Sequence, residues 1–536
     1  MILIKHVGLC LLSSVLLVLS FPDWDIGILA WAALIPLLHV LSGQGARRSF
    51  CFCFLCGIFF FLGIFNWILT VSYYRIYHHA ILAFYLGSYF GCFGLGFGYI
   101  SKRLGRSAAL LAAPFLWIVL EYLRGNFFFL ALPWGFLGHT QYQFPHVIQI
   151  ASLFGTYIVS FLIVLVNAAL AQAIHRAPVL FSRKVHCSRL HRFTKTDYVL
   201  FGSAALCILT SLIYGYRIIT APMTGAPFQV SLVQGNIEQK KKWDSAYSDE
   251  IMKIYSDLST RASMNQPDLI VWPETATPGS ITVNPEIFEK VGKIVNKTGI
   301  PHLLGSAQHQ KYVKNLTEMP KLVNSAFFVM PGEEYEKMQQ YDKIRLFPFG
   351  EYLPYKNTLP WELIRVSSLN EYVQGTEYTI FHFYPYRFGV TICWENIFPD
   401  LVRQFARRGS QFIINITNEA RFGKTAAPYQ LAAISVFRAV ENKTYVIRCA
   451  NTGISCIIDP FGRIVSRLKD IKGEDIFTRG VLTGKIIPHH TGSLYTRYGD
   501  LLIFISLIVS ICFILIAATY RNRSMTSKRT IDVSIE

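Results

Sequence analysis

The sequence predicts two structural parts, a multi-pass α-helical membrane domain of about eight helices and an extracytoplasmic domain built as an α/β layered sandwich. The 536-residue chain is 52% hydrophobic, which is more apolar than soluble proteins usually are. Its charged residues are sparse before Thr196, dense between Gln239 and Arg479, and absent from Leu501 to Ala518. This pattern, with boundaries near Thr220 and Gly499, predicts seven helices within residues 1–220, a polar external domain at 221–497, a final helix at 498–520 and a basic tail at 521–536.

The membrane helices are predicted from apolar runs near the roughly 20 residues that cross the hydrocarbon layer. The first run is interpreted as a retained helix rather than a secretory signal, because no small-x-small cleavage site follows it before Phe21. The second and fifth runs are short, so their ends are less well defined. The eight predicted spans are Ile4–Phe21, Ile26–Leu41, Phe50–Val71, Ala80–Ile100, Ala108–Tyr122, Val147–Ala171, Tyr198–Tyr214 and Leu501–Tyr520.

Basic residues in the short loops predict the orientation of these helices, because such loops are retained in the cytoplasm. They follow the second, fourth, sixth and eighth spans, whereas the intervening loops carry few positive charges. Both termini are therefore expected in the cytoplasm, and residues 221–497 outside it. The net charge of +18 also favours attraction to anionic lipid headgroups, and no ordered basic and aromatic array indicates a nucleic-acid partner. The basic loop residues are Arg47, Arg48, Lys102, Arg103, Arg106, Arg176, Arg183, Lys184, Arg189, Arg192, Lys195, Arg521, Arg523, Lys528 and Arg529.

The cysteine pattern argues against a disulfide framework. Of eleven cysteines, only Cys393, Cys449 and Cys456 lie in the predicted external domain, and an odd number leaves a thiol unpaired. The closely spaced cysteines at 51, 53 and 56 lie in an apolar run, where helix packing is a better interpretation than metal binding. The sequence contains no phosphate-binding loop and no His-Glu-x-x-His pair. The glycines of Gly94–Gly98 lie in a predicted membrane helix, where they allow a neighbouring helix to pack closely. We expect no metal and no cofactor.

The external domain is predicted to alternate strands and helices. Short β-branched runs alternate with longer amphipathic segments, which indicates sheets covered by helices. Helices are expected near 244–264 and 427–441, and a hairpin turn at 460–462. The predicted strands are 229–233, 268–272, 301–305, 325–330, 388–392, 412–416, 445–449, 455–459 and 463–468.

Three residues of this domain are candidate catalysts, namely Glu274, Lys343 and Cys393. Glu274 and Cys393 each follow a predicted strand, so both are expected on one rim of the sandwich. A cysteine is nucleophilic only as thiolate and needs a base and a cation nearby, which Glu274 and Lys343 supply. Each residue alone is more often structural, as a buried thiol, a solvated carboxylate or a surface ammonium. Their coincidence in one domain favours acyl transfer through a thioester.

The surrounding motifs resemble those of a known family. Val-Trp-Pro-Glu274, Lys343 followed by Pro-Phe-Gly-Glu351, and Cys393-Trp-Glu395 are similar to the Glu-Lys-Cys signature of the nitrilase superfamily, and within it to the apolipoprotein N-acyltransferases. The resemblance implies a nitrilase-like αββα sandwich and extends over nearly the whole chain. The remaining motifs that carry it are Pro22–Trp24, Leu29–Pro36, Glu121–Gly125, Pro133–Gly135, Gly155–Asn167, Gln234–Ile237 and Gly480–Thr483.

This resemblance implies a two-step reaction. Cys393 would take an acyl chain from a phospholipid, expected to be the sn-1 chain of phosphatidylethanolamine, and pass it to the α-amino group of a diacylglyceryl-cysteine at an apolipoprotein N-terminus. Glu274 would be the general base and acid, and Lys343 would stabilise the oxyanion. A bacterial inner membrane with the catalytic domain on the periplasmic side is implied, and nothing demands more than a monomer. Supporting carboxylates are implied at Glu351 and Glu395, and residues for substrate access or binding at Trp134, Trp243 and Trp394.

Two positions depart from the family pattern. Trp394 stands where tyrosine is frequent, and Arg421 stands where tryptophan is usual, which bears on lipid preference rather than on the reaction class. The apolar segment Lys356–Gly375 is interpreted either as a loop that dips into the outer leaflet or as an ordinary packed loop. Two other functions stay open. An amidase would use the same three residues and pass the acyl group to water, and a lipid carrier would need none of them.

Overall fold

The structure is a computed structural model of the chain and describes residues 2–181, 193–242, 244–309, 322–334, 337–364, 371–489 and 492–532. Its contacts divide the chain into two compact units. The first, called here the helical unit, is formed within residues 1–69, 73–219 and 500–536. The second, called the sandwich unit, is formed within residues 70–72 and 220–499.

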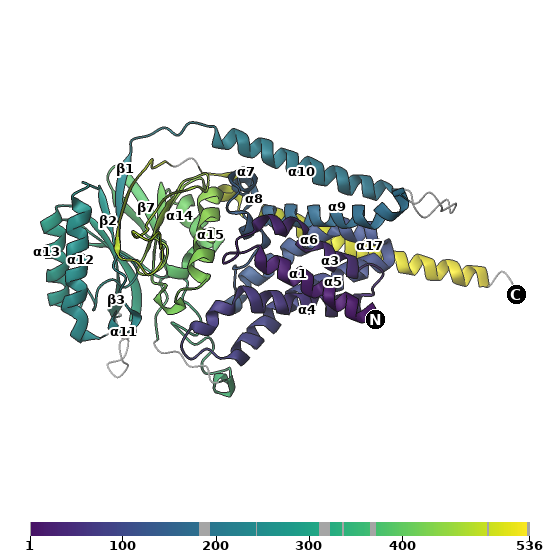
Figure 1. Ribbon diagram of the computed structural model, residues 1–536, viewed down its shortest axis with the longest axis horizontal. Helices are drawn as coiled ribbons and strands as arrows, with labels where there is room; N and C mark the ends of the chain where they lie inside the picture. Colours follow the sequence, from purple (N-terminus) through teal and green to yellow (C-terminus); the bar gives the residue numbers. More distant parts are fainter. Residues whose placement is uncertain are drawn as a thin grey trace. The chain divides into compact units, whose positions relative to one another are not determined.

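The helical unit contains, within the described residues, seven helices that are long and apolar enough to cross a membrane. In Figure 1 they appear as a bundle, in which α4 packs along α5, α6 along α5 and α9, and α17 along α5 and α6. The predicted multi-pass helical domain is thus confirmed as a class of fold. The seven helices are α1 (Ile2–Leu19), α4 (Ala46–Ile64), α5 (Ile76–Leu104), α6 (Arg106–Asn126), α9 (Tyr157–Phe181), α10 (Lys195–Ile219) and α17 (Leu501–Asp532).

The second predicted span, Ile26–Leu41, is not one continuous helix. It forms three short pieces, η1 (Gly27–Leu29), α2 (Ala30–Ala33) and α3 (Ile35–Val40), because the chain breaks just before Pro36, which has no N–H to donate. The sixth predicted span likewise begins as α7 (Pro145–Ile148) and α8 (Ala151–Phe154), and α9 starts only after Gly155, whose φ is +73°. Apolar composition located both segments but did not reveal these breaks.

The amide of Asn167 on α9 is inserted into the broken helix. Its Oδ1 accepts from Leu34 N at 2.9 Å and its Nδ2 donates to Ala30 O at 2.9 Å, so it bridges the two groups that an unbroken helix would join directly. Ser13 Oγ accepts from Leu37 N at 3.0 Å. Backbone groups in an apolar environment need such partners, since no water is present to replace a lost hydrogen bond.

Small residues let α4 and α5 pack closely, in agreement with the interpretation of the glycine run. A Cβ at Gly94 would lie 2.2 Å from Ser49 O, and one at Gly98 would lie 2.5 Å from Ser49 Oγ. Cys53 and Cys56 on α4 are fully buried in this region of the helical unit.

Two six-stranded sheets form the centre of the sandwich unit. Their strand orders are β12-β1-β2-β3-β4-β5 and β11-β10-β9-β8-β7-β6. In each sheet three central strands run parallel, β1, β2 and β3 in one and β7, β8 and β9 in the other, with antiparallel strands outside them. The strands are β1 (Phe228–Gln234), β2 (Leu269–Val271), β3 (His302–His309), β4 (Leu322–Val329), β5 (Gln339–Asp342), β6 (Ile380–Phe383), β7 (Tyr386–Ile392), β8 (Phe412–Thr417), β9 (Tyr445–Ala450), β10 (Cys456–Ile458), β11 (Ile464–Arg467) and β12 (Gly480–Ile486).

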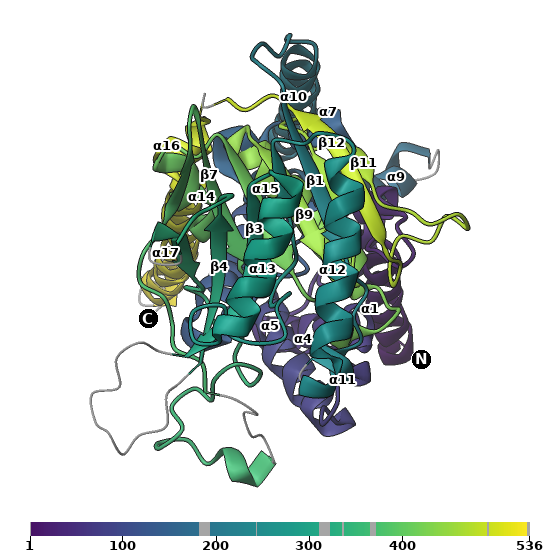
Figure 2. The same cartoon turned by 90° about the vertical axis from the view of Figure 1, so that its left-hand side faces the viewer.

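Helices cover the outer faces of both sheets. α12 (Ser248–Ser263) and α13 (Pro285–Thr298) lie on the first sheet and α14 (Pro399–Arg407) and α15 (Ala427–Asn442) on the second, while β1 meets β9 and β4 meets β7 between the sheets. Figure 2 shows α12 and α13 in front of the strands. The predicted αββα sandwich is confirmed. The shorter helices of the chain are η2 (Asn66–Thr70), η3 (Phe128–Leu130), η4 (Leu137–Gln141), α11 (Gln239–Lys242), η5 (Ser245–Tyr247), η7 (Trp361–Ile364), η8 (Cys393–Ile397), η9 (Ala420–Phe422) and α16 (Leu494–Tyr498).

Three strands were not predicted from the sequence. β5 and β6 are four-residue strands at the outer ends of the sheets, where one side of the strand needs no partner and apolar alternation is weak. β12 mixes glycine, polar and apolar residues without regular alternation and is only partly buried along most of its length. Local patterns identified the buried central strands well, because those are nearly continuous apolar runs.

Replacing Asn167 by leucine should destabilise the helical unit by at least about 2 kcal/mol, because a buried N–H and a buried C=O both lose their partner. The apparent midpoint of thermal unfolding in detergent should fall by roughly 4 to 8 °C. Asn126→Leu removes a hydrogen bond from an exposed asparagine side chain to the carbonyl of Tyr122 and serves as the control. Equal midpoints for the two variants would contradict the role assigned to Asn167.

Candidate active site

Three strands of the sandwich unit bring the reactive side chains together. Glu274 follows β2 closely, Lys343 directly follows β5, and Cys393 directly follows β7. Lys343 Nζ lies 3.5 Å from Glu274 Oε1, and the Cys393 thiol lies close enough to Glu274 for the charge of the carboxylate to raise the thiol pKa. Glu274 and Lys343 follow strands of one sheet, and Cys393 follows a strand of the other. The site therefore lies where strand ends of the two sheets come together.

The Glu274 carboxylate is buried, but both of its oxygens accept hydrogen bonds from the protein. Asn324 Nδ2 donates to Oε1 at 2.8 Å, and the backbone N–H of Asn418 donates to Oε2 at 2.8 Å. Burial favours the neutral acid, but the charges of Lys343 and Lys242 together with these hydrogen bonds outweigh it and lower the pKa of Glu274. The residue is therefore a carboxylate at neutral pH and can accept a proton.

Lys343 is held as a charged ammonium. Its Nζ donates to Glu351 Oε1 at 2.8 Å, and its backbone N–H donates to the Asn324 carbonyl at 2.9 Å. Burial acts to lower the pKa of Lys343, but Glu351, Glu274 and Cys393 raise it well above its usual value. The side chain can thus stabilise negative charge but cannot act as a base.

Cys393 occupies a sharp turn between β7 and η8. Its φ is +57°, a left-handed conformation that costs energy for any residue with a Cβ and is found at functional sites. Asn415 Nδ2 donates to the Cys393 carbonyl at 3.1 Å, which helps to fix this conformation. Burial and the Glu274 charge raise the pKa of Cys393 to about 12, against the opposing effects of Lys343 and Thr417. The resting residue is consequently a thiol that must give its proton to a base as it reacts.

Glu351 and Glu395 lie close to the three candidate catalysts, and they make different contacts. Glu351 Oε1 accepts from Lys343 and from Asn324 Nδ2, while its Oε2 accepts from Phe347 N at 2.7 Å. It therefore orients the ammonium and the loop that follows it.

Glu395 joins the two sheets through its carboxylate. Oε1 accepts from the backbone N–H groups of Ile344 at 2.6 Å and Arg345 at 2.9 Å, and Oε2 accepts from Ile392 N at 2.7 Å. The Tyr341 hydroxyl contacts both oxygens. Ile344 follows Lys343 and Ile392 precedes Cys393, so one buried carboxylate positions both reactive residues. Burial raises the pKa of Glu395 to about 7, although these hydrogen bonds oppose it.

The tryptophans proposed for substrate access have different surroundings. Trp394 is buried, donates from Nε1 to the Arg345 carbonyl at 2.6 Å and packs edge-on against Phe347 and Phe398. Trp134 lies in the helical unit, where it packs on Trp67 at 5.1 Å between ring centroids and is only 4% exposed. Trp243 lies outside the described residues. A role in access stays a prediction for all three.

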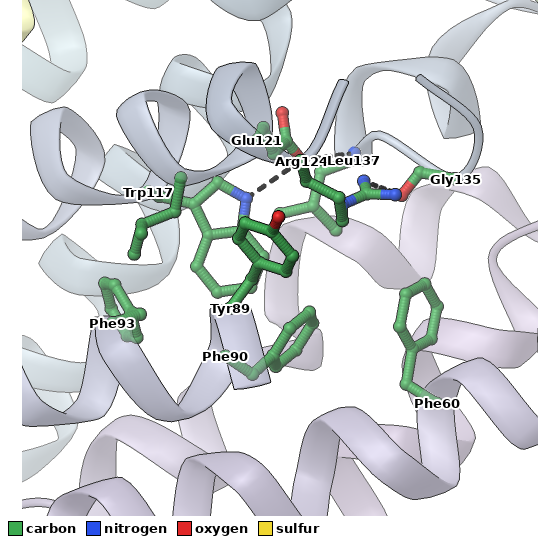
Figure 3. A pocket seen from close by; sticks show the side chains of 10 residues that line it. Phe60, Tyr89, Phe90, Phe93, Trp117, Glu121, Arg124, Gly135 and Leu137 are labelled. Carbon is green, nitrogen blue, oxygen red and sulfur yellow. Dashed lines mark hydrogen bonds between the residues drawn. The ribbon is translucent and has the colours of Figure 1, made fainter. Parts of the chain in front are cut away.

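Two charged residues of α6 hold the loop that carries Trp134. Arg124 donates to the carbonyls of Leu132, Trp134 and Gly135, and Glu121 Oε1 accepts from Leu137 N at 2.9 Å and from Trp117 Nε1 at 3.0 Å. Figure 3 shows both side chains at a pocket whose lining includes the aromatic residues Phe60, Phe90 and Trp117. The motif Glu121–Gly125 thus satisfies irregular backbone inside the helical unit.

Sequence reasoning missed three residues of the site. Asn324 and Asn418 bind the Glu274 carboxylate, and Lys242 donates from Nζ to the Glu274 carbonyl at 2.8 Å. Lys242 ends a run of three lysines that resembles a solvated surface, which is why it carried no signal. Asn418 could have been suspected from its place directly after a buried strand.

The arrangement combines a thiol nucleophile, a carboxylate base and a fixed cation, which is the set required for acyl transfer through a thioester. Among the described residues, no group of three or more His, Cys, Asp or Glu side chains could hold a metal ion. The charge on the oxyanion of a tetrahedral intermediate would be met by Lys343.

Comparison with known proteins gives matches along most of the chain. Residues 13–169 match the family model of the apolipoprotein N-acyltransferase N-terminal domain, and residues 229–492 match that of carbon-nitrogen hydrolases. The chain is 35% identical to an apolipoprotein N-acyltransferase of Geobacter metallireducens, with 96% of each chain covered. It is 30% identical to an apolipoprotein N-acyltransferase of Chlorobaculum tepidum, covering 97% of this chain and 98% of the relative. An amidase from Nesterenkonia sp. AN1 of known structure covers 50% of this chain and 93% of its own, with 17% identity and a TM-score of 0.36.

Replacing Glu274 by glutamine should change the alkylation rate and the acylation rate of Cys393 in opposite directions. Loss of the negative charge lowers the pKa of Cys393, so alkylation of this residue by iodoacetamide at pH 8 should become faster. Acylation of Cys393 by a p-nitrophenyl acyl ester should instead slow by about 10²- to 10⁴-fold, because the base is lost. Both rates can be followed on the Cys393 peptide by mass spectrometry. Slower alkylation, or unchanged acylation, would contradict this assignment.

Replacing Glu395 by glutamine should destabilise the sandwich unit by about 2 kcal/mol, because an amide cannot accept from both sets of backbone N–H groups. Hydrogen exchange at the backbone amides of Ile344 and Ile392 should become faster. The rate of Cys393 acylation should decrease in the same variant. The control is Glu289→Gln, which removes an exposed ion pair with Lys293 and should change stability by less than about 0.5 kcal/mol. If both variants unfold at the same temperature, Glu395 does not join the sheets as described.

Proposed function

The chain belongs to the apolipoprotein N-acyltransferase family, and on that premise we propose that it transfers an acyl chain from a phospholipid, through a thioester on Cys393, to the α-amino group of the N-terminal diacylglyceryl-cysteine of apolipoproteins. The product would be a triacylated lipoprotein. The observation that carries the proposal is the Cys393 thiol next to the Glu274 carboxylate, with Lys343 Nζ 3.5 Å from that carboxylate, in a chain with seven membrane-length helices among its described residues.

In the first half-reaction, Glu274 takes the thiol proton as Cys393 Sγ attacks the carbonyl carbon of the donor ester. Lys343 stabilises the oxyanion of the tetrahedral intermediate. When the intermediate collapses, the ester C–O bond breaks and Glu274 returns the proton to the departing lysophospholipid alkoxide. The enzyme is left as a thioester with Glu274 again ionised, so it is ready to accept a second proton.

In the second half-reaction, the α-amino nitrogen of the lipoprotein attacks the thioester carbonyl. Glu274 accepts a proton from this nitrogen, and Lys343 again meets the oxyanion charge. The C–S bond breaks, and the thiolate recovers the proton from Glu274 as the amide is released. A thioester reacts readily with amines, so no nucleotide is consumed in either step.

The donor is proposed to be a membrane phospholipid, with phosphatidylethanolamine as the expected source. A membrane-embedded protein reaches such esters directly. We further propose that the sandwich unit lies on the periplasmic side of a bacterial inner membrane with both termini in the cytoplasm, because the basic residues gather in alternate loops. The protein is proposed to act as a monomer.

The segment that begins near Lys356 is proposed to contact the outer leaflet. Leu363 is 82% exposed and Tyr355 is 59% exposed, so apolar groups project from it into the surroundings. Trp361 is held by a hydrogen bond from its Nε1 to the Pro354 carbonyl at 2.6 Å and by edge-on packing with Phe349. Exposed apolar side chains on a supported turn suit contact with lipid.

Amide hydrolysis is a second candidate function. The match of residues 229–492 to carbon-nitrogen hydrolases favours it, since the same three residues could pass an acyl group to water. The two functions differ in the acceptor that empties the thioester, which the following experiment measures.

Wild-type protein given phospholipid should gain the mass of one acyl chain on Cys393, and should lose it when a diacylated lipopeptide with a free N-terminal amine is added. Cys393→Ala should abolish both the adduct and lipopeptide acylation. Cys512→Ala, which removes an exposed thiol of α17, is the matched control and should react normally. Continued lipopeptide acylation by Cys393→Ala would exclude Cys393 as nucleophile, and rapid loss of the adduct to water alone would favour the hydrolase.

A further inference from the structure

We propose that Lys242 is a second cation of the active site, which holds the main chain of Glu274 and keeps its carboxylate ready to receive the Cys393 proton. Lys242 acts through Glu274 and is therefore a positioning residue rather than a catalytic one. The inference deepens the proposed acyl transfer and rests on it.

The contacts of Lys242 are unusual for a lysine. Its side chain ends α11 and is only 4% exposed, and its Nζ donates to the Glu274 carbonyl at 2.8 Å. Among the described residues this is its one hydrogen bond, and no carboxylate of those residues forms a salt bridge with it. A buried ammonium that has one hydrogen-bond partner among the described residues is costly to stability. Such a cost is typical of a residue that serves function.

The position of Lys242 is fixed by the same network that holds Glu274. Asn418 Nδ2 donates to Gln239 Oε1 at 3.0 Å at the start of α11, while Asn418 N donates to Glu274 Oε2. Asn451 exchanges two hydrogen bonds with the backbone of Ile237, just before the helix. The short helix and the catalytic carboxylate are therefore linked through one asparagine.

The backbone that Lys242 grips is under constraint. Thr275, the next residue after Glu274, has a φ of +45°, and this turn lies so close to β3 that a Cβ at Gly305 would be 2.6 Å from Thr275 N. A hydrogen bond to the Glu274 carbonyl stabilises the turn at this point. Without this hydrogen bond, the Glu274 carboxylate would be less well oriented toward the Cys393 thiol.

The charge of Lys242 acts on the same two groups. Glu274 and Cys393 face it and raise its pKa, Arg421 from η9 lowers it, and burial, the largest effect, brings the pKa of Lys242 down to about 7. Lys343 differs because Glu351 and Glu274 keep it charged. Lys242 can thus lose its charge near neutral pH, and while it is charged it lowers the pKa of Glu274.

The test compares Lys242→Met and Lys242→Arg in the full-length protein. The rate of acyl adduct formation on Cys393 from phospholipid vesicles is measured as a function of pH. Lys242→Met should lower the rate at pH 7 by roughly 10- to 100-fold and move the acid limb about one pH unit upward, because Glu274 becomes harder to ionise. Lys242→Arg keeps the charge and should retain the wild-type limb. Lys240→Met, at an exposed position on the same helix, should match wild type throughout.

A double variant separates positioning from a merely structural effect. On a Glu274→Gln background, Lys242→Met should reduce acylation by less than about twofold further, because the group through which it acts is gone. A full additional loss would overturn the proposal, as would an unshifted acid limb in Lys242→Met.

Iodoacetamide alkylation of Cys393 tests the same charge without lipid. Loss of the Lys242 cation should slow alkylation below pH 7, where Lys242 is charged and favours the thiolate, and should leave the rate above pH 9 unchanged. An unchanged profile would overturn the inference. If wild type forms no acyl adduct while the alkylation profile shifts as expected, the proposed acyl transfer fails and the placement of Lys242 stands.

Discussion

The alignment of two separate sheets is the constraint on which the active site depends. Glu274 and Lys343 extend from the first sheet and Cys393 from the second, so a shift of one sheet against the other would separate base and nucleophile. The Glu395 carboxylate resists that shift by binding backbone N–H groups on both sides. The hydrogen bond from Asn418 N to Glu274 provides a second link between the sheets. The carboxylates of both links, Glu395 and Glu274, are buried, so the links lie where water has little access.

The distribution of charge follows from this geometry. One carboxylate lies between two ammonium groups, and a second carboxylate, Glu351, is bound to Lys343. Glu274 therefore stays ionised in spite of burial, and Cys393 stays protonated because a negative charge lies beside it. A neutral thiol is less exposed to oxidation and alkylation than a thiolate.

In the helical unit, too, buried polar side chains bind backbone groups that would otherwise have no partner. Its broken second segment and the loop at 132–137 expose backbone groups that a regular helix would pair internally. Asn167, Glu121 and Arg124 supply the missing partners from neighbouring helices. Polar side chains in an apolar bundle thus have a structural reason to be there, because each one satisfies backbone atoms that lipid could not.

The sequence by itself determined the apolar helices and the buried central strands, and it singled out the three candidate catalytic residues, because these depend on local composition and on residues next to strand ends. The family resemblance of the motif Cys393-Trp-Glu395 also implied that Glu395 is a supporting residue, but not what it binds. Only the tertiary structure decided that Glu395 joins the sheets, that Lys242 is buried beside Glu274, and that Asn167 bridges the broken second span. These features arise from contacts between residues 30 to 140 positions apart, such as Lys242 with Glu274 and Asn167 with Leu34. Burial and hydrogen bonding at that separation depend on how the chain packs, which periodicity along the sequence does not encode.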